Sequence, residues 1–336
     1  MKYFLQMIFL VILCTKSIAQ AEIETKEVYY KQNGTTLKGY LAYDSSIKGK
    51  RPGILVVHEW WGHNKHAQER ANMLAEIGYT ALAVDMYGDG KLANHPKKAG
   101  EYMSAAFNNW DISKARFTKA KEVLQSHKTV DDKYIGAIGF CFGGEVSLRM
   151  ARAGNDLVGV VAFHSALPLQ PTIKKMKASV LVINGSKDGF LKPETVGTFS
   201  SQMTKSNADF TYISLAGVKH SYTNKQADEF RKKFDIQALE YNKQADERAW
   251  SEMRKFFKRI SLYYHHHNVN YNYCKIISRI VSWTYWRTVY YSVSHSNKRT
   301  RRACIFIYCH FNRHRVWRKL SSCYVFRCIS IAYCHG

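Results

Sequence analysis

Short, continuous apolar runs separated by amphipathic stretches limit the folds that this chain can adopt. The runs at 53–58 (GILVVH), 80–85 (TALAVD) and 179–185 (SVLVING) are the clearest examples. A strand with apolar residues throughout must be covered on both faces, which is typical of a parallel sheet. Because a segment with helical spacing at 66–77 lies between the first two runs, repeated strand–helix–strand units are predicted. The sequence therefore predicts an α/β protein, with a mostly parallel sheet and helices on both faces.

The predicted domain covers residues 22–261. Its first strands form a hairpin that turns at Asn33 and Gly34, a dipeptide that favours a two-residue turn. Its last element is a long amphipathic helix over 234–260, whose apolar residues are three or four apart. The other elements expected are helices near 97–108, 112–126 and 145–153 and strands at 134–140, 157–164 and 209–215.

Residues 1–19 have the pattern of a secretory signal peptide. A basic second residue precedes an apolar run, and Ser17 and Ala19 are the small residues expected before a cleavage site. The run is shorter than the roughly 20 residues of a membrane-spanning helix, which disfavours a retained anchor. Leu13 is too large for the cleavage that would attach a lipid to Cys14. The mature chain is therefore expected to be periplasmic or secreted, without a stable membrane anchor.

Residues 262–336 have a composition that does not fit a folded domain. They contain no Asp, Glu or Pro, but 12 Lys or Arg and six of the eight Cys, whereas domains normally carry both signs of charge. The Cys spacings include no C-x2-C pair, which disfavours a metal or disulfide module. No aromatic platform supports a nucleic-acid-binding arm. We interpret this tail as disordered, or as translation in a shifted reading frame.

The remaining 261 residues have an ordinary charge. They carry 38 Lys or Arg and 26 Asp or Glu, a net charge of +12 against +24 for the whole chain. This is typical of a solvated surface and gives no reason to expect a nucleic-acid partner.

The segment 139–144 (GFCFGG) fits a nucleophile elbow with cysteine at its centre. A predicted strand enters it and a predicted helix leaves it, which is the context that the elbow requires. Gly139 and Gly143 would relieve crowding in the sharp turn, and Cys141 would lie at a helix N-terminus, where a thiolate is favoured. The alternative is a small buried cysteine in a glycine-rich loop.

Two later residues favour the catalytic interpretation. Asp188 follows the strand predicted at 179–185, and His220 follows the strand predicted at 209–215. Open α/β sheets place their sites at the carboxyl ends of strands, and nucleophile, acid and histidine occur in this order in α/β hydrolases. Cys141, Asp188 and His220 are therefore predicted to form a catalytic triad.

Five segments resemble the dienelactone hydrolase family of the α/β-hydrolase superfamily. They are HEWWG (58–62), VDMYGDGK (84–91), GFCFGG (139–144), NGSKD (184–188) and GVKHSYTN (217–224). The resemblance extends over about residues 25–260 and implies the α/β-hydrolase fold as a single catalytic domain. It also implies a hydrolase that cleaves a small ester or lactone, with no metal and no cofactor.

The expected chemistry is acyl transfer to sulfur. Cys141 attacks the carbonyl, His220 accepts the thiol proton and later gives it to the leaving alkoxide, and Asp188 orients His220. The backbone N–H of Phe142, next to the nucleophile, is one predicted oxyanion donor. The resemblance implies that the N–H of Trp60 is the second.

The resemblance assigns further residues to the site. It implies that Glu59 switches the cysteine between thiol and thiolate, and that Ser221 contacts the substrate. Trp61 is expected to shape the pocket, and Lys91 to supply charge. The arginines with which the family holds a substrate carboxylate are absent, and Asn224 stands at one of their positions. We therefore do not expect dienelactone itself to be the substrate.

The sequence thus favours an exported, monomeric esterase or lactonase that acts on a small molecule. A noncatalytic ligand-binding protein on the same fold and a cysteine peptidase remain open as alternatives.

Overall fold

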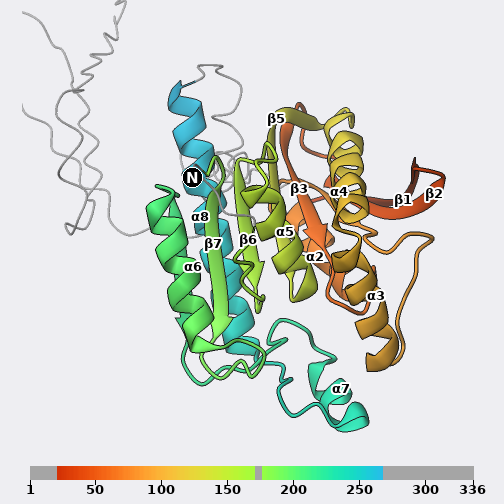
Figure 1. Ribbon diagram of the computed structural model, residues 1–336. Coiled ribbons are helices and arrows are strands. Elements are labelled where there is room, and N and C mark those ends of the chain that lie inside the picture. Colours follow the sequence, from red (N-terminus) through yellow and green to blue (C-terminus); the bar gives the residue numbers. More distant parts are fainter. Residues whose placement is uncertain (1–20, 171–175, 268–336) are drawn as a thin grey trace, which may run out of the picture. The chain divides into compact units, whose positions relative to one another are not determined.

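The structure is a computed structural model that describes residues 21–170 and 176–267, all within Met1–Cys274, one of two units into which the chain divides. One eight-stranded sheet with the order β1-β2-β4-β3-β5-β6-β7-β8 forms its centre (Figure 1). Its strands are β1 (Ile23–Gln32), β2 (Thr35–Asp44), β3 (Arg51–Val57), β4 (Thr80–Val84), β5 (Val130–Phe140), β6 (Gly159–Phe163), β7 (Ser179–Gly185) and β8 (Phe210–Leu215).

The pairing of the strands is mostly parallel. β1 and β2 form an antiparallel hairpin in which Gln32 pairs with Thr35, so that Asn33 and Gly34 make the turn. β2 is antiparallel to β4, and the remaining pairs are parallel. The predicted mostly parallel sheet and its N-terminal hairpin are confirmed.

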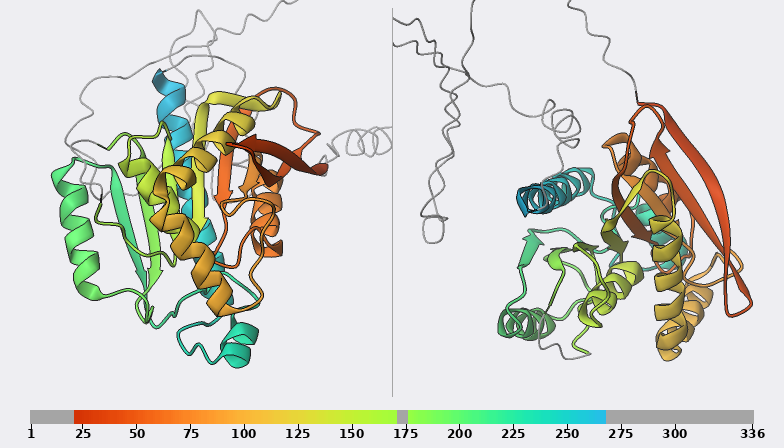
Figure 2. Two further views of the ribbon diagram at one scale, coloured as in Figure 1. Left: turned by 45° about the vertical axis from the view of Figure 1, so that its right-hand side comes forward. Right: turned by 90° about the horizontal axis from the view of Figure 1, so that it is seen from above.

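Helices cover both faces of the sheet, as Figure 2 shows from two further directions. They are α2 (Lys65–Glu76), α3 (Pro96–Asn108), α4 (Trp110–Gln125), α5 (Phe142–Arg152), α6 (Pro193–Lys205), α7 (Ala227–Phe234) and α8 (Lys243–His267). Within residues 21–170 and 176–267, no helix is long and apolar enough to cross a membrane.

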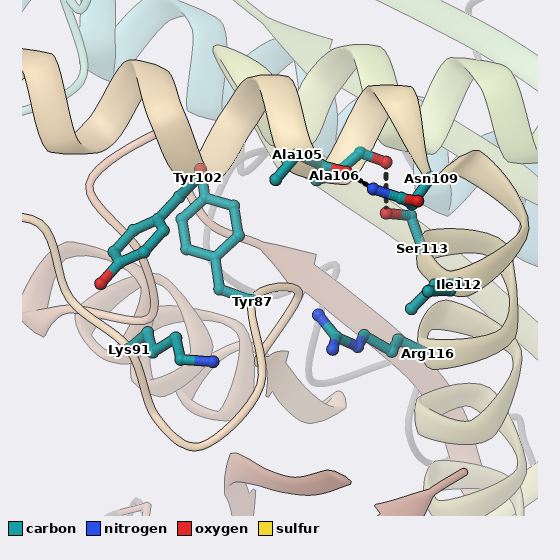
Figure 3. Close-up of a pocket in the computed structure, with 9 residues that line it drawn as sticks. All are labelled: Tyr87, Lys91, Tyr102, Ala105, Ala106, Asn109, Ile112, Ser113 and Arg116. Carbon is teal, nitrogen blue, oxygen red and sulfur yellow. Dashed lines mark hydrogen bonds between the residues drawn. The ribbon is translucent and has the colours of Figure 1, made fainter.

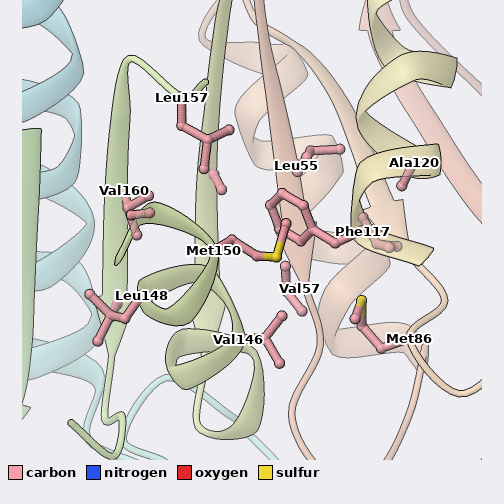
Figure 4. Packing of buried hydrophobic residues seen from close by; sticks show 14 of the residues in the cluster. Leu55, Val57, Met86, Phe117, Ala120, Val146, Leu148, Met150, Leu157 and Val160 are labelled. Atoms are coloured by element: carbon pink, nitrogen blue, oxygen red, sulfur yellow. The ribbon is translucent and has the colours of Figure 1, made fainter. Parts of the chain in front are cut away.

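Two apolar cores follow from the alternation of side chains along buried strands. In β3, Leu55 and Val57 join the core under α4, α5 and α6, part of which is shown in Figure 4. Ile54 and Val56 join the core under α2 and α8. All four are at most 1% exposed, and full burial of such a side chain contributes about 1.5–3 kcal/mol. The continuous apolar runs are explained by this double coverage.

The predicted helix over 234–260 is wrong at its start. α7 ends at Phe234, and Asp235 adopts the left-handed conformation (φ 53°) that stops a helix. The next segment turns back to the sheet edge, where Leu239 is buried and bridges to His220. The last helix therefore begins only at Lys243. α6 and α7 were not among the predicted elements.

Candidate active site

Cys141 lies at a sharp turn between β5 and α5. Its backbone has φ 51° and ψ −115°, in the positive-φ region that non-glycine residues rarely adopt. Gly139 and Gly143 permit this turn, because a Cβ atom on Gly139 would lie 2.0 Å from the Gly143 carbonyl oxygen. The strained turn presents the sulfur at the carboxyl edge of the sheet, where functional strain is commonly found.

Replacing Gly143 with alanine is expected to disrupt the elbow. A Cβ atom there would lie 2.2 Å from the Val57 carbonyl oxygen, so that strand β3 or helix α5 would have to shift. Overpacking of this kind typically costs about 1–3 kcal/mol. Thermal unfolding should show a clearly lower Tm for Gly143→Ala. As the control, Gly197→Ala in α6 has open space around the new Cβ, and because alanine is the better helix former it should keep or raise Tm. An unchanged Tm for Gly143→Ala would contradict the described turn.

Asp188 and His220 meet at the ends of neighbouring strands. Asp188 follows β7 and His220 follows β8, and Asp188 Oδ2 lies 2.7 Å from His220 Nδ1. Both residues are buried, at 7% and 5% exposure. Phe190, which sequence reasoning missed, is 57% exposed and packs its ring 4.9 Å from the His220 ring. The contact places an apolar side chain at the edge of the acid–histidine pair.

Cys141 is the second polar partner of His220. Its side chain is within hydrogen-bonding contact of the imidazole. Burial disfavours the charged imidazole, but the Cys141 sulfur and the Asp188 carboxylate outweigh it and raise the pKa of His220 to about 10. The structure thus brings together the three residues predicted as a triad, with a charged imidazole between two acidic groups.

A buried histidine holds the peptide that the sequence assigns to the second oxyanion donor. Met86 N–H donates to His58 Nε2 (3.3 Å), so that Nδ1 carries the proton of the neutral ring and donates to the Glu59 carbonyl (2.5 Å). Burial lowers the pKa of His58 to about 4, which keeps it neutral. The same peptide group carries the Trp60 N–H, and Tyr87 Oη donates to the next carbonyl, that of Trp60 (3.0 Å).

The other predicted oxyanion donor belongs to Phe142. As the first residue of α5, Phe142 has an N–H group without an intrahelical acceptor. Its ring is buried and packs on His58 and Tyr87 at 5.7 and 5.4 Å. The two predicted donors are therefore connected by one packed cluster. No sequence signal assigned His58 or Tyr87 to it.

Glu59 is 1% exposed and has polar partners on the loop after His220. Ser221 Oγ donates to Glu59 Oε1 (3.1 Å), and Asn224 Nδ2 donates to Oε2 (2.5 Å). Burial raises the pKa of Glu59 above its ordinary value, against these two hydrogen bonds and the positive charge at His220. Asn224, at a position where the resemblance implies an arginine, thus contacts the glutamate directly.

Of the three remaining predicted site residues, one contacts the buried site and two do not. Ser221 is 4% exposed, and its hydroxyl is engaged with Glu59. Trp61 is 3% exposed and packs on Phe230 and Phe234 of α7 at 4.5 and 5.9 Å, so that it supports this helix. Lys91 pairs with a neighbouring aspartate on the exposed loop after β4. The structure brings only Ser221, of these three, into contact with the buried site.

A pocket of about 200 Å³ is lined by Tyr87 and by residues of α3 and α4 (Figure 3). Tyr87 lines this pocket and also packs on Phe142. The lining is completed by the following residues: Lys91, Tyr102, Ala105, Ala106, Asn109, Ile112, Ser113 and Arg116. Lys91 therefore lies at this pocket. Within residues 21–170 and 176–267, no group of three or more His, Cys, Asp or Glu could hold a metal ion.

The sheet order and the strand–turn–helix at Cys141 define the class of α/β hydrolases. The model of the dienelactone hydrolase family matches residues 37–261. The chain belongs to the dienelactone hydrolase family, and it is a hydrolase.

Relatives and solved structures agree with this assignment. The protein usf of Aquifex pyrophilus is 28% identical over 69% of this chain and 96% of its own length. A relative from Aquifex aeolicus (strain VF5), whose name refers to carboxymethylenebutenolidase, is 27% identical over the same shares. A dienelactone hydrolase-like promiscuous phosphotriesterase from metagenomic libraries has a TM-score of 0.67 at 29% identity, covering 71% of this chain and 99% of that one.

Proposed function

We propose that this protein hydrolyses a small carboxylic ester or lactone with Cys141 as the nucleophile. One observation carries the proposal: the cysteine at the strained turn contacts a histidine that is paired with a buried aspartate. The family assignment and the names of relatives support the ester or lactone bond as the target.

The proposed reaction begins with Cys141 as a thiolate beside protonated His220, the state reached when Glu59 has taken up the thiol proton. The thiolate attacks the carbonyl carbon, and the tetrahedral oxyanion accepts hydrogen bonds from the N–H groups of Phe142 and Trp60. The C–O bond breaks as His220 gives its proton to the alkoxide, which leaves as an alcohol or as the opened end of a lactone. Neutral His220 then deprotonates a water, which attacks the thioester, and the carboxylic acid leaves as the thiolate is restored.

Glu59 is proposed to set the ionisation state of Cys141. As a carboxylate it can take up the thiol proton, which leaves the thiolate beside His220; a Glu59 that is already protonated cannot do so. Two features support this role. The Glu59 carboxyl is buried next to the peptide that carries the Trp60 N–H. The positive charge of His220 favours the ionised form of this carboxyl.

The substrate is proposed to be small. The pocket lined by Tyr87 holds about 200 Å³ and is lined largely by aromatic and aliphatic side chains. Cys141, Asp188 and His220 do not line it, but Tyr87 connects it to Phe142 of the elbow, and we propose that it takes the acyl or alcohol part of an ester. Because Asn224 occupies an arginine position of the family and is bonded to Glu59, we do not propose dienelactone as the substrate.

A chromogenic short-chain ester tests the proposed function. Turnover is expected, and iodoacetamide should abolish it in step with alkylation of the peptide that contains Cys141, the single cysteine of residues 20–261. Hydrolysis of peptides without hydrolysis of esters would support a cysteine peptidase. Neither turnover nor stoichiometric alkylation near neutral pH would support a noncatalytic binding protein.

Export after removal of residues 1–19 is proposed from the sequence pattern alone, because these residues lie outside the described ranges. Detection of the chain in a periplasmic or culture fraction, beginning near residue 20, is the expected result. Retention of the uncleaved chain in the cytoplasm would contradict the proposal.

The hydrolase domain is proposed to end with α8, and residues 268–336 lie outside the described ranges. The end of α8 belongs to the domain, because Ile260 is buried and Tyr134 Oη donates to its carbonyl (3.2 Å). A chain that ends after His267 should therefore keep its Tm and its esterase activity. Loss of soluble protein on this truncation would show that the tail is part of the folded protein.

A further inference from the structure

A buried histidine faces Glu59 without reaching it. His66, on α2, is 6% exposed, and its Nδ1 atom has no hydrogen-bond partner. This atom lies 4.0 Å from Glu59 Oε2. Buried polar atoms are normally paired, because an unsatisfied one costs free energy. A shift of roughly 1 Å in the Glu59 carboxyl would close the distance to that of a hydrogen bond.

Arg70 determines which ring nitrogen of His66 carries the proton. Arg70 Nε donates to His66 Nε2 over 3.4 Å, and a guanidinium can only donate. Nε2 therefore accepts from Arg70, and Thr223 Oγ1 lies 3.4 Å from the same atom as a second possible donor, so we assign the proton of the neutral ring to Nδ1. Burial and the nearby charge of Arg70 lower the pKa of His66 well below its ordinary value, so that the ring is neutral.

The guanidinium itself is firmly held. Arg70 Nη2 donates to Asp246 Oδ2 of α8 (2.8 Å) and to the Thr223 carbonyl (2.5 Å). Its charge also faces the rings of Phe140 and Trp250 at 5.5 and 5.4 Å. The orientation of the His66 ring is thus fixed from the side opposite Glu59.

An ionised Glu59 needs more donors than it has now. A buried carboxylate is costly unless hydrogen bonds to its charged form compensate for lost hydration. Ser221 and Asn224 supply two such bonds. The protonated Nδ1 of His66 is the unused donor on the Oε2 side. His164 Nε2 lies 4.0 Å from Oε1, but it is already engaged with Thr223 Oγ1 at 2.8 Å.

We propose that His66 is a positioning residue for Glu59, whose Nδ1–H group holds the Glu59 carboxylate while that group is ionised and ready to take up the thiol proton. The inference rests on the proposed function, in which Glu59 sets the state of Cys141. His66 contacts no reacting atom and acts only through Glu59.

The proposal determines the direction of a pH effect. Loss of the His66 donor destabilises the carboxylate, so that Glu59 keeps its proton to higher pH. Other charged or titratable groups face this region and stay in place in the variants below: Arg70, His164, His220, Lys225 and Asp246. The acidic limb of the kcat/KM profile, which reports on the free enzyme, should move to higher pH, and the alkaline limb should not.

Two variants of His66 separate the two ring nitrogens. In His66→Gln, the side-chain amide can occupy the Nε2 position that faces Arg70, but the donor toward Glu59 is lost. In His66→Asn, the shorter amide keeps a donor near the Nδ1 position. We expect His66→Gln to move the acidic limb of the kcat/KM profile to higher pH by about one pH unit. At pH values below the limb, kcat/KM should be about tenfold lower than in the wild type. His66→Asn should retain the wild-type acidic limb. Glu59→Gln removes the titrating carboxyl, so neither His66 substitution should shift the acidic limb that remains in that background.

Three results would overturn the proposal. These are an unshifted limb in His66→Gln, an equal shift in both variants, and a shift that persists in the Glu59→Gln background. If the variants do not fold, ¹⁵N NMR of the unaltered protein decides, because His66 must show the Nδ1–H tautomer and an Nε2–H tautomer contradicts it. Absence of ester turnover in the wild type would instead refute the proposed function, and the NMR measurement would still test the contact.

Discussion

Replacing Cys141 with alanine is expected to lower kcat/KM for a chromogenic ester by a factor on the order of 10⁵. The side chain lies at the one position where the strained turn, the N-terminus of α5 and the imidazole of His220 converge. Without the sulfur no acyl-enzyme can form, and only binding and the N–H groups of Phe142 and Trp60 remain to accelerate attack by water.

The fold should survive this substitution. Cys141 is only partly buried, and alanine removes one sulfur atom without adding volume. A Tm close to that of the wild type, together with the loss of activity, therefore assigns the effect to chemistry. A loss of tenfold or less in correctly folded Cys141→Ala would exclude the cysteine as the nucleophile.

Replacing His220 with alanine is expected to lower kcat by 10³ or more, on the order of losses seen for triad bases. The imidazole contacts both Cys141 and Asp188. Because the two residues act as a unit, Cys141→Ala combined with His220→Ala should lose little more than Cys141→Ala alone. Additive losses, or a tenfold loss or less in the single variant, would remove His220 from the triad.

The same substitution has a pH signature in stability. The folded-state pKa of His220 is raised from 6.5 to about 10, so its contribution to stability is fully present below pH 6.5 and is lost as the pH rises through about 10. The Tm difference between wild type and His220→Ala should therefore be largest below pH 6.5 and smallest above pH 10. A difference that does not change with pH would mean that His220 is not held as an imidazolium.

The fold was predictable because its signals are local and repeated. The central parallel strands carry continuous apolar runs, as in β3 and β7, and the Asn33–Gly34 turn alone indicates the first hairpin. The end of α7 was not predictable, because it depends on Asp235 adopting a left-handed conformation. Apolar residues continue at helical spacing through the segment after Asp235, so periodicity alone placed the start of the last helix at 234 rather than at Lys243.

The approximate location of the site was predictable from the order of its residues along the chain. Parallel strands end at one edge of the sheet, so residues that follow β5, β7 and β8 had to converge there. The surroundings were not predictable, because they depend on tertiary contacts between distant segments. The Glu59–Asn224 hydrogen bond joins residues 165 positions apart. His58 belongs to the HEWWG segment, but its role in orienting a peptide was not predicted, and His66 gave no sequence signal, since a histidine that orients a peptide or a carboxyl looks like any buried histidine.

Trapping the acyl-enzyme tests the central claim most directly. A slowly hydrolysed ester should be mixed with the protein, quenched in acid, and examined by mass spectrometry of the intact chain and of its peptides. The account predicts one acyl group on the peptide that contains Cys141, labile to neutral hydroxylamine as a thioester is, and its accumulation in His220→Ala if acylation still occurs. An acyl group on a serine, or turnover in wild type and Cys141→Ala at similar rates, would contradict it.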